Sequence, residues 1–365
     1  MPNAETPHRG PEEMPVALVT GITGQDGGYL AELLLEKGYV VHGLSRMAES
    51  LDRTRFQDLA DIGNRLHLHN CDLRDGDAVF RLIEEIRPAE IYNLAAQTHV
   101  QASYEDPDIT ADVNAAGADR LLRALEKIYP SRDVRFFQAS TSEMFGDAKG
   151  VLLNEGRPLR PLSPYAISKL QAFEATVKFR ETLGFFASNG ILFNHESPHR
   201  GLSFVTRKIS SAVAARHLGD RQPLRLGNLD VRRDWGHARD YAEAMWLILR
   251  HDFPGDYVVA TGENHSVREF VEIAFAETGR EIEWQGTGMD ERGLDMQTRE
   301  VLVEIDPAFF RHVDVVATLG DASKARAELG WRPRVSFRAL VGEMVAGDIR
   351  RLSGLARSGT SAGPD

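Results

Sequence analysis

The chain has 365 residues, of which 42% are hydrophobic and 27% are charged, and its formal net charge is −11. This composition is typical of a globular protein large enough for one big α/β domain or two smaller ones, and the negative charge argues against nucleic acid as a partner. No apolar run is long enough to span a membrane, and the single cysteine, Cys71, excludes an internal disulfide and a multi-cysteine zinc site, so the cytoplasm is the expected location.

Strand-like and helix-like segments alternate through the first half of the chain, while the polar ends, residues 1–14 and 353–365, are predicted to be disordered tails. Strands are predicted at Val16–Thr20, Val40–Leu44, Leu66–Asn70, Ile91–Leu94, Val134–Gln138 and Gly190–Phe193. Helices are predicted from Gly28 onward and at Ala78–Ile86, Asp112–Lys127 and Pro164–Leu183. The alternation predicts a Rossmann-type α/β fold, in which a doubly wound parallel sheet carries helices on both faces.

The alternation breaks down after Asn194. Charged helical patterns such as Val267–Thr278 then alternate with short strand-like pieces at Leu224–Leu226 and Tyr257–Ala260. We expect a smaller, partly interleaved α/β domain that closes a cleft over the C-terminal ends of the strands. The segment Gly286–Thr298 has no periodicity and is predicted to be a mobile surface loop.

A glycine-rich turn lies between the first predicted strand and the first predicted helix. A G-x-x-G-x-x-G run at such a turn lets the backbone approach a pyrophosphate, which rests on the N-terminus of the helix. The turn therefore predicts a dinucleotide site. Its expected cofactor contacts are Gly21, Thr23, Gly24, Gln25, Asp26 and Gly27.

The ends of the next two strands bear on which nicotinamide cofactor binds. NAD-binding proteins carry an acidic residue about 20 positions past the glycine turn, whereas an Arg there accommodates a 2′-phosphate. The second strand is followed by Arg46 and has no acid at its tip, so the sequence favours NADP; a solvated surface role for Arg46 is the alternative. Asp72, after the third strand, suits the adenine edge and equally suits a turn.

Tyr165 and Lys169 form a Y-x-x-x-K pair on one face of the predicted helix Pro164–Leu183. A nearby ammonium and the positive ring of a cofactor lower the pKa of a phenol, so the tyrosinate becomes available as a base. Thr141 follows the strand Val134–Gln138, and we expect its hydroxyl at the C-terminal edge of the sheet. A Ser or Thr, a Tyr and a Lys in this arrangement are the hydride-transfer set of the short-chain dehydrogenase/reductase superfamily, which the chain resembles.

Glu143, two residues past Thr141, adds a function that hydride transfer does not need. A dehydratase needs a base for the proton α to a newly formed ketone, and a carboxylate in a partly dry cleft suits that task. A surface charge at the end of a strand is the alternative.

The run from His195 to His199 matches H-E-x-x-H, a zinc-protease signature that works only on a helix. Here it follows a predicted strand, and Pro198 lies inside it, which disfavours helical geometry. We therefore predict no metal site.

Eight longer motifs make the chain resemble the GDP-mannose 4,6-dehydratase family, an extended branch of the short-chain dehydrogenases, from about Val16 to Arg351. The motifs are GITGQDG (Gly21–Gly27), YNLAAQ (Tyr92–Gln97), QASTSEMFG (Gln138–Gly146), SPYAISK (Ser163–Lys169), GILFNHESP (Gly190–Pro198), FVTRKI (Phe204–Ile209), LGNLDVRRDWGHARDY (Leu226–Tyr241) and VATGENHSVREF (Val259–Phe270). FVTRKI and RDWG are more diagnostic than the glycines.

The resemblance implies a role for each matching residue. Tyr165 would take the proton of the sugar C4 hydroxyl, Glu143 would remove the C5 proton, and Thr141 with Glu143 would assist loss of the C6 hydroxyl. Lys169 would hold the nicotinamide ribose and tune Tyr165. Further implied cofactor contacts are Leu73, Leu94, Ala95, Ala96, Gln97, His195 and Arg200. The implied substrate contacts are Ser142, Asn194, Lys208, Leu226, Gly227, Arg233, Arg311 and Asp314.

The chain departs from the family pattern in four places. Arg46–Glu49 has one Arg and an acid where the family has two arginines and two serines that grip the 2′-phosphate and help tetramers form. NAD therefore stays open as the alternative cofactor, and a homodimer as the alternative to a homotetramer. Leu162 replaces an arginine, Ala166 replaces a glycine, and Arg311–Val316 differs from R-P-x-E-V-D in a way that could reshape the base or sugar pocket.

The leading interpretation is an NADP-dependent lyase that converts GDP-mannose to GDP-4-keto-6-deoxymannose, with a small-molecule substrate and neither nucleic acid nor membrane as a partner. A nucleotide-sugar epimerase or reductase on the same fold, a dehydratase for another GDP-hexose or heptose, and a non-catalytic dinucleotide sensor are the alternatives. The expected NADP-binding domain comprises residues 15–190 with part of 228–262. The expected substrate-binding domain comprises residues 191–227 and 263–352.

Overall fold

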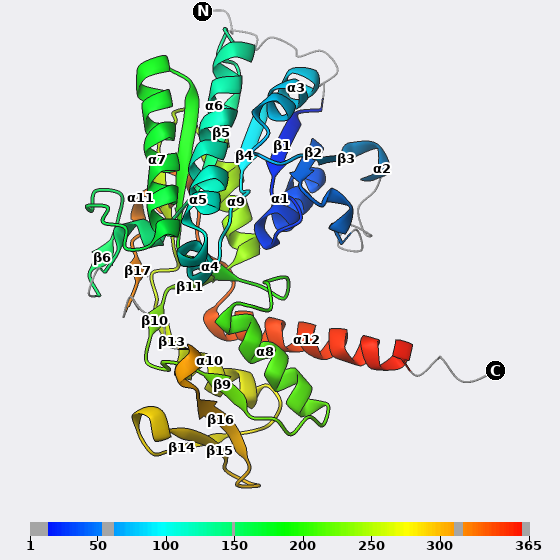
Figure 1. The fold of residues 1–365 in the computed structure, drawn as a ribbon, viewed down its shortest axis with the longest axis vertical. Coiled ribbons are helices and arrows are strands. Elements are labelled where there is room, and N and C mark those ends of the chain that lie inside the picture. Colours follow the sequence, from blue (N-terminus) through cyan, green and yellow to red (C-terminus); the bar gives the residue numbers. More distant parts are fainter. Residues whose placement is uncertain (1–13, 53–61, 148–149, 310–316, 360–365) are drawn as a thin grey trace, which may run out of the picture.

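A computed structural model of the chain describes residues 14–52, 62–147, 150–309 and 317–359. Figure 1 shows a larger body built around one long sheet and a smaller body below it, from which the helix α12 extends to the side. The described residues include no helix that is both long enough and apolar enough to cross a membrane.

The larger body contains a seven-stranded sheet whose neighbouring strands are all parallel. The strand order is β12-β7-β5-β4-β1-β2-β3, so the predicted doubly wound sheet is confirmed. The order reverses between β1 and β4, and a crevice at such a point is where open α/β sheets bind ligands. The strands are β1 (Val16–Thr20), β2 (Val40–Ser45), β3 (Leu66–Asn70), β4 (Glu90–Asn93), β5 (Arg135–Thr141), β7 (Phe186–Leu192) and β12 (Asp256–Val259).

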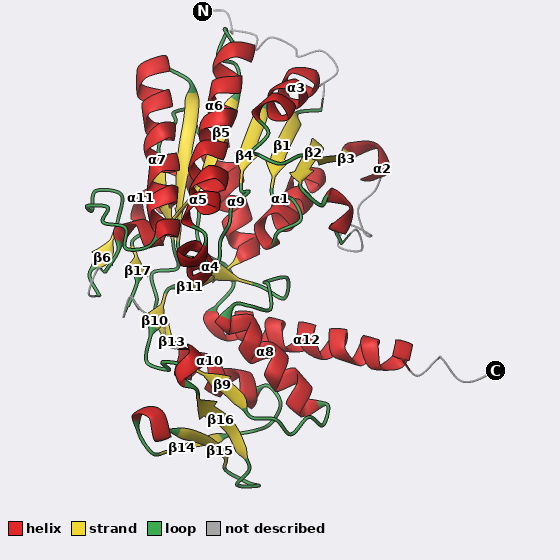
Figure 2. Ribbon diagram, viewed as in Figure 1, coloured by secondary structure: helices red, strands yellow, loops and turns green. Residues whose placement is uncertain are grey.

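Helices cover both faces of this sheet (Figure 2). One face packs under α1 and α9 through buried side chains such as Leu30, Leu34 and Met245, and the other under α3, α6 and α7 through Leu121 and Phe179. The longer helices are α1 (Gln25–Glu36), α3 (Gly76–Ile86), α6 (Gly117–Ile128), α7 (Pro164–Leu183) and α9 (Ala238–Arg250). Short turns of helix are η1 (Ala48–Ser50), α2 (Ile62–Arg65), α4 (Val100–Glu105), α5 (Pro107–Ala111) and η4 (Ser142–Phe145).

The ends of α7 show why this stretch is a helix of fixed length. The Ser163 hydroxyl accepts a hydrogen bond from the Ala166 amide, and Pro164 occupies the first helical position. Gly184 ends the helix at φ +71°, a conformation that glycine adopts without strain. Two other predictions differ in detail: α1 begins three residues before Gly28, and the predicted helix Asp112–Lys127 opens with a π-helical turn, η3 (Asp112–Ala116).

The smaller body contains a four-stranded sheet in the order β14-β15-β16-β9, packed against α8 and α10 with α12. Its core includes Val213, Phe270, Val303 and Leu340. The strands are β9 (Leu224–Leu226), β14 (Ile282–Gln285), β15 (Arg292–Asp295) and β16 (Val301–Ile305). The helices are α8 (Val205–His217), α10 (Val267–Ala276), η5 (Gly288–Asp290), η6 (Pro307–Phe309) and α12 (Phe337–Gly359).

The prediction of a mobile loop at Gly286–Thr298 is wrong for its central part. Strand β15 lies inside the small sheet and pairs with β14 on one side and β16 on the other. Gly293 fits there because a Cβ would come within 3.0–3.2 Å of Ile282, Trp284 and Val303. The sequence did not indicate this strand because four residues that include a glycine are too few to show an alternation of apolar and polar side chains.

Short two-stranded sheets lie where the chain passes from one body to the other. They are β8 (Asn194–Glu196) with β11 (Trp235–His237), β10 (Arg232–Arg233) with β13 (His265–Ser266), and β6 (Leu152–Leu153) with β17 (Leu319–Gly320). The chain returns to the larger body late: Ala322, Ala325 and Trp331, in and around α11 (Ser323–Leu329), pack in the core under the large sheet. This return differs from the expected assignment of the whole of 263–352 to the substrate-binding domain.

Candidate active site

The glycine turn is shaped by close contacts that leave no room for side chains. Gly21 has φ +70°, and a Cβ there would lie 2.9 Å from the backbone of Ala95. A Cβ on Gly27 would lie 2.4 Å from the Gly21 carbonyl oxygen. The turn is held tight by its own backbone, since the Gly21 amide donates to the Leu44 carbonyl at 2.8 Å and the Gly24 amide to the Gly21 carbonyl at 3.0 Å. A negatively charged group such as a pyrophosphate can therefore come close to the N-terminus of α1.

Side-chain hydrogen bonds join the turn to the end of β4. The Thr20 hydroxyl donates to the Asn93 side chain at 2.8 Å and accepts from the amides of Leu94 and Ala95 at 3.0 Å each. The predicted cofactor contacts Leu94, Ala95, Ala96 and Gln97, all half-buried, therefore lie at the switch point of the sheet. Gln97 uses its side chain within the protein, where it donates to the His99 carbonyl and to Thr110.

Two predicted cofactor contacts in the turn are bound to the segment that follows β7. Gln25 accepts a hydrogen bond from Ser197 at 2.8 Å and donates one to the His195 carbonyl at 3.1 Å. Asp26 forms an ion pair with His195, with 2.8 Å between Oδ2 and Nε2. His195 lies in strand β8, not in a helix, so the H-E-x-x-H run lacks the geometry of a zinc-protease site.

The predicted catalytic residues come together at the C-terminal end of β5. Tyr165, Lys169 and Thr141 are buried, and Glu143, in η4 immediately after β5, is half-buried. Burial raises the pKa of Tyr165 to about 12 despite a hydrogen bond with Thr141, and the nearby charge of Glu143 adds to this rise. Thr141, Glu143 and Tyr165 are therefore close enough to act on one bound molecule.

Lys169 points its ammonium into the same region. Its Nζ donates to the Ala139 carbonyl at 2.9 Å, and burial lowers its pKa to about 8, against an opposing effect of the Asp26 carboxylate. Burial thus makes the Lys169 ammonium easier to deprotonate than a solvated one.

Asn114 is a site residue that the sequence analysis missed. It lies in the π-helical turn η3, donates to Ser168 at 3.0 Å and to the Gln97 carbonyl at 3.1 Å, and accepts from the Gln97 amide at 2.8 Å. Ser168 in turn donates to the Tyr165 carbonyl at 2.8 Å. Asn114 thus ties the helix that carries Tyr165 to the loop at the switch point. The sequence signal for Asn114 was a polar residue within a predicted helix.

The residues predicted to select the cofactor lie at the ends of β2 and β3. Arg46 is exposed, and Ser45 before it is hydrogen-bonded to Thr23 of the glycine turn at 3.0 Å. Asp72 forms an ion pair with Arg74 at 2.7 Å and also accepts from the Arg74 amide, which supports its alternative role as a turn residue. Leu73 is buried and packs against the large sheet.

The predicted substrate contacts divide between the two bodies. Ser142 is buried beside the catalytic residues, and Asn194 is half-buried in β8. Lys208 lies in α8 with its Nζ 3.1 Å from the centre of the Phe309 ring, and burial lowers its pKa. Arg233 is 6% exposed. Leu226 ends β9 and Gly227 follows it, and Arg311 and Asp314 lie outside the described residues. Arg200, which was predicted as a cofactor contact, forms an ion pair with Glu196 at 3.1 Å.

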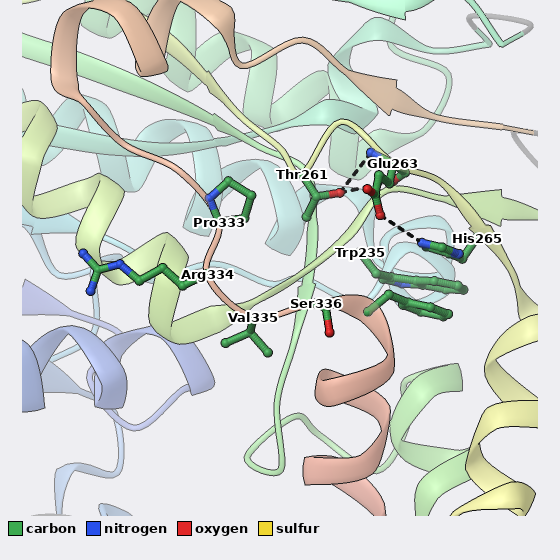
Figure 3. Close-up of a pocket in the computed structure, with 9 residues that line it drawn as sticks. Trp235, Thr261, Glu263, His265, Pro333, Arg334, Val335 and Ser336 are labelled. Atoms are coloured by element: carbon green, nitrogen blue, oxygen red, sulfur yellow. Dashed lines mark hydrogen bonds and ion pairs between the residues drawn. The ribbon is translucent and has the colours of Figure 1, made fainter.

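A separate pocket of about 210 Å³ lies where the chain crosses between the two bodies (Figure 3). The rings of Trp235, His265 and Phe337 form an aromatic side, and the pocket is also lined by Thr261, Glu263, Pro333, Arg334, Val335 and Ser336. None of the predicted site residues lines it. Across the described ranges, no group of three or more His, Cys, Asp or Glu side chains is arranged to hold a metal ion.

Solved structures with this fold include nucleotide-sugar enzymes. UDP-glucose 4-epimerase from Thermus thermophilus, crystallised with NAD, has a TM-score of 0.76 at 27% identity and matches 91% of this chain and 98% of its own. dTDP-glucose 4,6-dehydratase from Streptomyces venezuelae has a TM-score of 0.75 at 24% identity, over 93% of this chain and 98% of its own.

Sequence relatives are much closer. GDP-mannose 4,6-dehydratase from Sinorhizobium fredii is 51% identical over 343 residues, which cover 93% of this chain and 98% of that protein. The human protein named GDP-mannose 4,6 dehydratase is 50% identical over 339 residues, 92% of this chain and 91% of its own. The sequence profile described as GDP-mannose 4,6 dehydratase matches residues 18–344. The chain therefore belongs to the GDP-mannose 4,6-dehydratase family.

Proposed function

We propose that this protein is an NADP-dependent hydro-lyase that converts GDP-mannose to GDP-4-keto-6-deoxymannose with loss of water. The observation that carries the proposal is the position of Glu143 beside Thr141 and Tyr165 in a chain of this family. An epimerase or a reductase needs the Tyr and Lys but no carboxylate to remove a proton α to the ketone.

The site suits a dinucleotide. The glycine turn has no room for a Cβ at Gly21 or Gly27, and the first turn of α1 opens at the switch point of the sheet. Arg46 supports NADP over NAD. When bound, the oxidised nicotinamide would take a hydride from C4 of the sugar and return it to C6, and its positive ring would favour the tyrosinate form of Tyr165.

Tyr165 and Lys169 would act first. Tyr165 accepts the proton of the C4 hydroxyl, which turns C4 into a ketone as its hydrogen leaves. Burial holds the phenol in its protonated form, so the step depends on positive charge nearby. Arg200 lowers the pKa of Tyr165, and the Lys169 ammonium would add to this effect. Asn114 and Ser168 hold the helix backbone at Tyr165 in place during this transfer.

Glu143 and Thr141 would carry out the elimination. The C4 ketone acidifies the proton on C5, which Glu143 removes. The C6 hydroxyl then leaves as water with a proton from Glu143, assisted by the Thr141 hydroxyl, and a double bond forms between C5 and C6. C5 then takes a proton, which balances the proton that Tyr165 took from the C4 hydroxyl, and C6 gains the hydride that left C4. These two transfers complete the 4-keto-6-deoxy product, so the cofactor would end as it began.

The remaining predicted contacts would hold the nucleotide part of the substrate. Lys208 and Arg233 are basic groups suited to a diphosphate, and Asn194 offers a neutral amide at the crossing between the two bodies. Arg311 and Asp314 stay predictions for the base pocket. We propose a homodimer or homotetramer in the cytoplasm.

Purified protein incubated with GDP-mannose tests the function. We expect a product lighter by one water, no net consumption of NADPH, and transfer of deuterium from C4 of the substrate to C6 of the product. A panel of GDP-, CDP-, UDP- and dTDP-sugars separates this substrate from the alternatives. Steady NADPH consumption, or loss of the deuterium to solvent, would identify a reductase instead.

A further inference from the structure

A buried carboxylate that the proposed chemistry does not use lies in the strand β8. Glu196 is only 2% exposed. Its Oε2 accepts a hydrogen bond from the Thr206 hydroxyl at 2.7 Å and lies 3.1 Å from Nε of Arg200. A carboxylate loses its hydration when it is buried, so these two contacts compensate for the charge of Glu196.

Thr206 holds the carboxylate at the start of α8. The first turn of this helix has no acidic residue, and its N-cap, Phe204, makes no side-chain hydrogen bond. The N-terminus of a helix carries a partial positive charge, which favours a carboxylate beside it. Glu196 supplies from β8 the negative charge that the helix itself lacks there, so the carboxylate is fixed relative to α8.

The guanidinium of Arg200 is held on two sides. Besides the ion pair with Glu196, its central carbon lies 3.6 Å from the centre of the Phe204 ring. The Arg200 carbonyl oxygen accepts from Nη1 of Arg207 at 2.6 Å, and Arg207 is itself paired with the buried Asp348. The backbone and the ring face are thus fixed by other groups, and the ion pair with Glu196 fixes the direction in which the guanidinium points. Because a guanidinium has five N–H groups, Arg200 can still donate to a second anion.

Hydrogen bonds place Arg200 beside the glycine turn. The Arg200 amide donates to the Ser197 carbonyl at 3.0 Å, and the Ser197 hydroxyl donates to Gln25, in the first turn of α1, at 2.8 Å. In agreement with this position, burial raises the pKa of Asp26 and of Tyr165, and the charge of Arg200 lowers both. A guanidinium with a fixed direction suits phosphate oxygens, which it binds through parallel hydrogen bonds.

We propose that Glu196 is a positioning residue for the cofactor: held by Thr206, it fixes the guanidinium of Arg200 in the orientation that meets the phosphates of the dinucleotide. This inference rests on the proposed function only in taking Arg200 as a cofactor contact. Binding of the dinucleotide therefore depends on α8, the helix of the smaller body that carries Lys208.

The dissociation constant of NADP, measured by quenching of protein fluorescence, tests this role without catalysis. Glu196→Gln keeps the size of the side chain and an oxygen that can accept from Thr206, and it removes the charge that holds Arg200. NADP binding should weaken by about tenfold, because a charged hydrogen bond from Arg200 loses its alignment. If Glu196 acted only through its charge, removal of that charge near bound phosphates would tighten NADP binding, and this result would overturn the proposal.

Glu196→Asp provides a second variant that keeps the charge and shortens its reach. A positioning role predicts weaker NADP binding in this variant too, because the carboxylate no longer reaches both Thr206 and Arg200. Unchanged NADP binding in Glu196→Asp would show that only the charge matters and would contradict the proposal.

A double-mutant cycle decides whether Glu196 acts through Arg200. Arg200→Met alone should weaken NADP binding by about 10–100-fold. In the Arg200→Met background, Glu196→Gln should change the dissociation constant by less than about twofold, because the group that it positions is absent. The same loss in both backgrounds would mean that Glu196 acts on the fold and not through Arg200.

The matched control is Glu300→Gln, the same change at a carboxylate that pairs with the buried Arg216 at 2.7 Å. Both substitutions break an ion pair and should lower the melting temperature, but only Glu196→Gln should weaken NADP binding. Equal weakening in the two variants would assign the effect to stability and overturn the proposal.

Failure of this inference differs from failure of the proposed function. If Arg200→Met binds NADP normally while the wild type dehydrates GDP-mannose, the role of Glu196 is wrong and the function stands. If the wild type does not dehydrate GDP-mannose while the NADP dissociation constants change as expected, the function is wrong and the role of Glu196 stands.

Discussion

Replacing Glu143 by Gln should stop the reaction halfway. The substitution keeps the size of a half-buried side chain at the end of β5 and removes the only carboxylate assigned to the C5 proton. A general base supplies a rate factor of about 10²–10⁴, which corresponds to about 2.7–5.5 kcal/mol of activation free energy. Turnover should fall by that factor.

The first half of the reaction should survive the same substitution. The charge of Glu143 favours the protonated form of Tyr165, so its removal lowers the pKa of Tyr165. At pH values below the pKa of Tyr165 in the wild type, C4 oxidation should therefore proceed at least as fast in the variant as in the wild type. Rapid mixing with GDP-mannose should show NADPH absorbance that rises and persists, whereas the wild type should show little accumulation.

The matched control is Glu174→Gln, the same change at an exposed position of α7. It should leave turnover and NADPH accumulation at wild-type values. Near-normal turnover in Glu143→Gln would refute its role as the base. If NADPH formation is lost together with turnover, Glu143 is also needed for C4 oxidation, and the assignment of that step to Tyr165 without Glu143 is wrong.

Three further outcomes are expected. Arg46→Ala should weaken NADP by about 10–100-fold, since a charged hydrogen bond contributes about 1.5–3 kcal/mol, and should leave NAD nearly unchanged; equal losses in parallel titrations would show that Arg46 does not read the phosphate. Gly27→Ala should abolish dinucleotide binding and lower the melting temperature, because its Cβ would lie 2.4 Å from the Gly21 carbonyl oxygen, whereas Gly63→Ala, with open space around it, should do neither. Burial lowers the pKa of His42 to about 4, and the nearby His67 and His69 add to this effect. As the pH falls, His42 therefore takes up a proton in the unfolded chain before it does so in the folded protein. The stability that His42 contributes above about pH 6.5 should be lost as the pH falls toward 4. The partial exposure of His42 reduces the expected loss of folding free energy to about 1–2 kcal/mol. The midpoints of urea unfolding at about pH 7.5 and about pH 5 should therefore differ less in His42→Gln than in the wild type.

Much of the site could be predicted because its signals are local. The glycine turn is recognised from seven consecutive residues between a strand and a helix, and Tyr165 and Lys169 from a spacing of four on one helix. Asn114 was missed because its function depends on a π-helical turn and on Ser168, 54 positions away. No pattern within a helix encodes such a partner.

The sequence by itself determined the parallel sheet and placed the candidate residues at its edge, since strand periodicity and the glycine turn are set by backbone geometry over a few residues. Only the tertiary structure decided that Arg292–Asp295 is a strand, that the chain returns to the larger body around Trp331, and that Asp26 meets His195. Each of these depends on groups far apart in the chain. Their energies arise from burial and pairing, which exist only after the chain has folded.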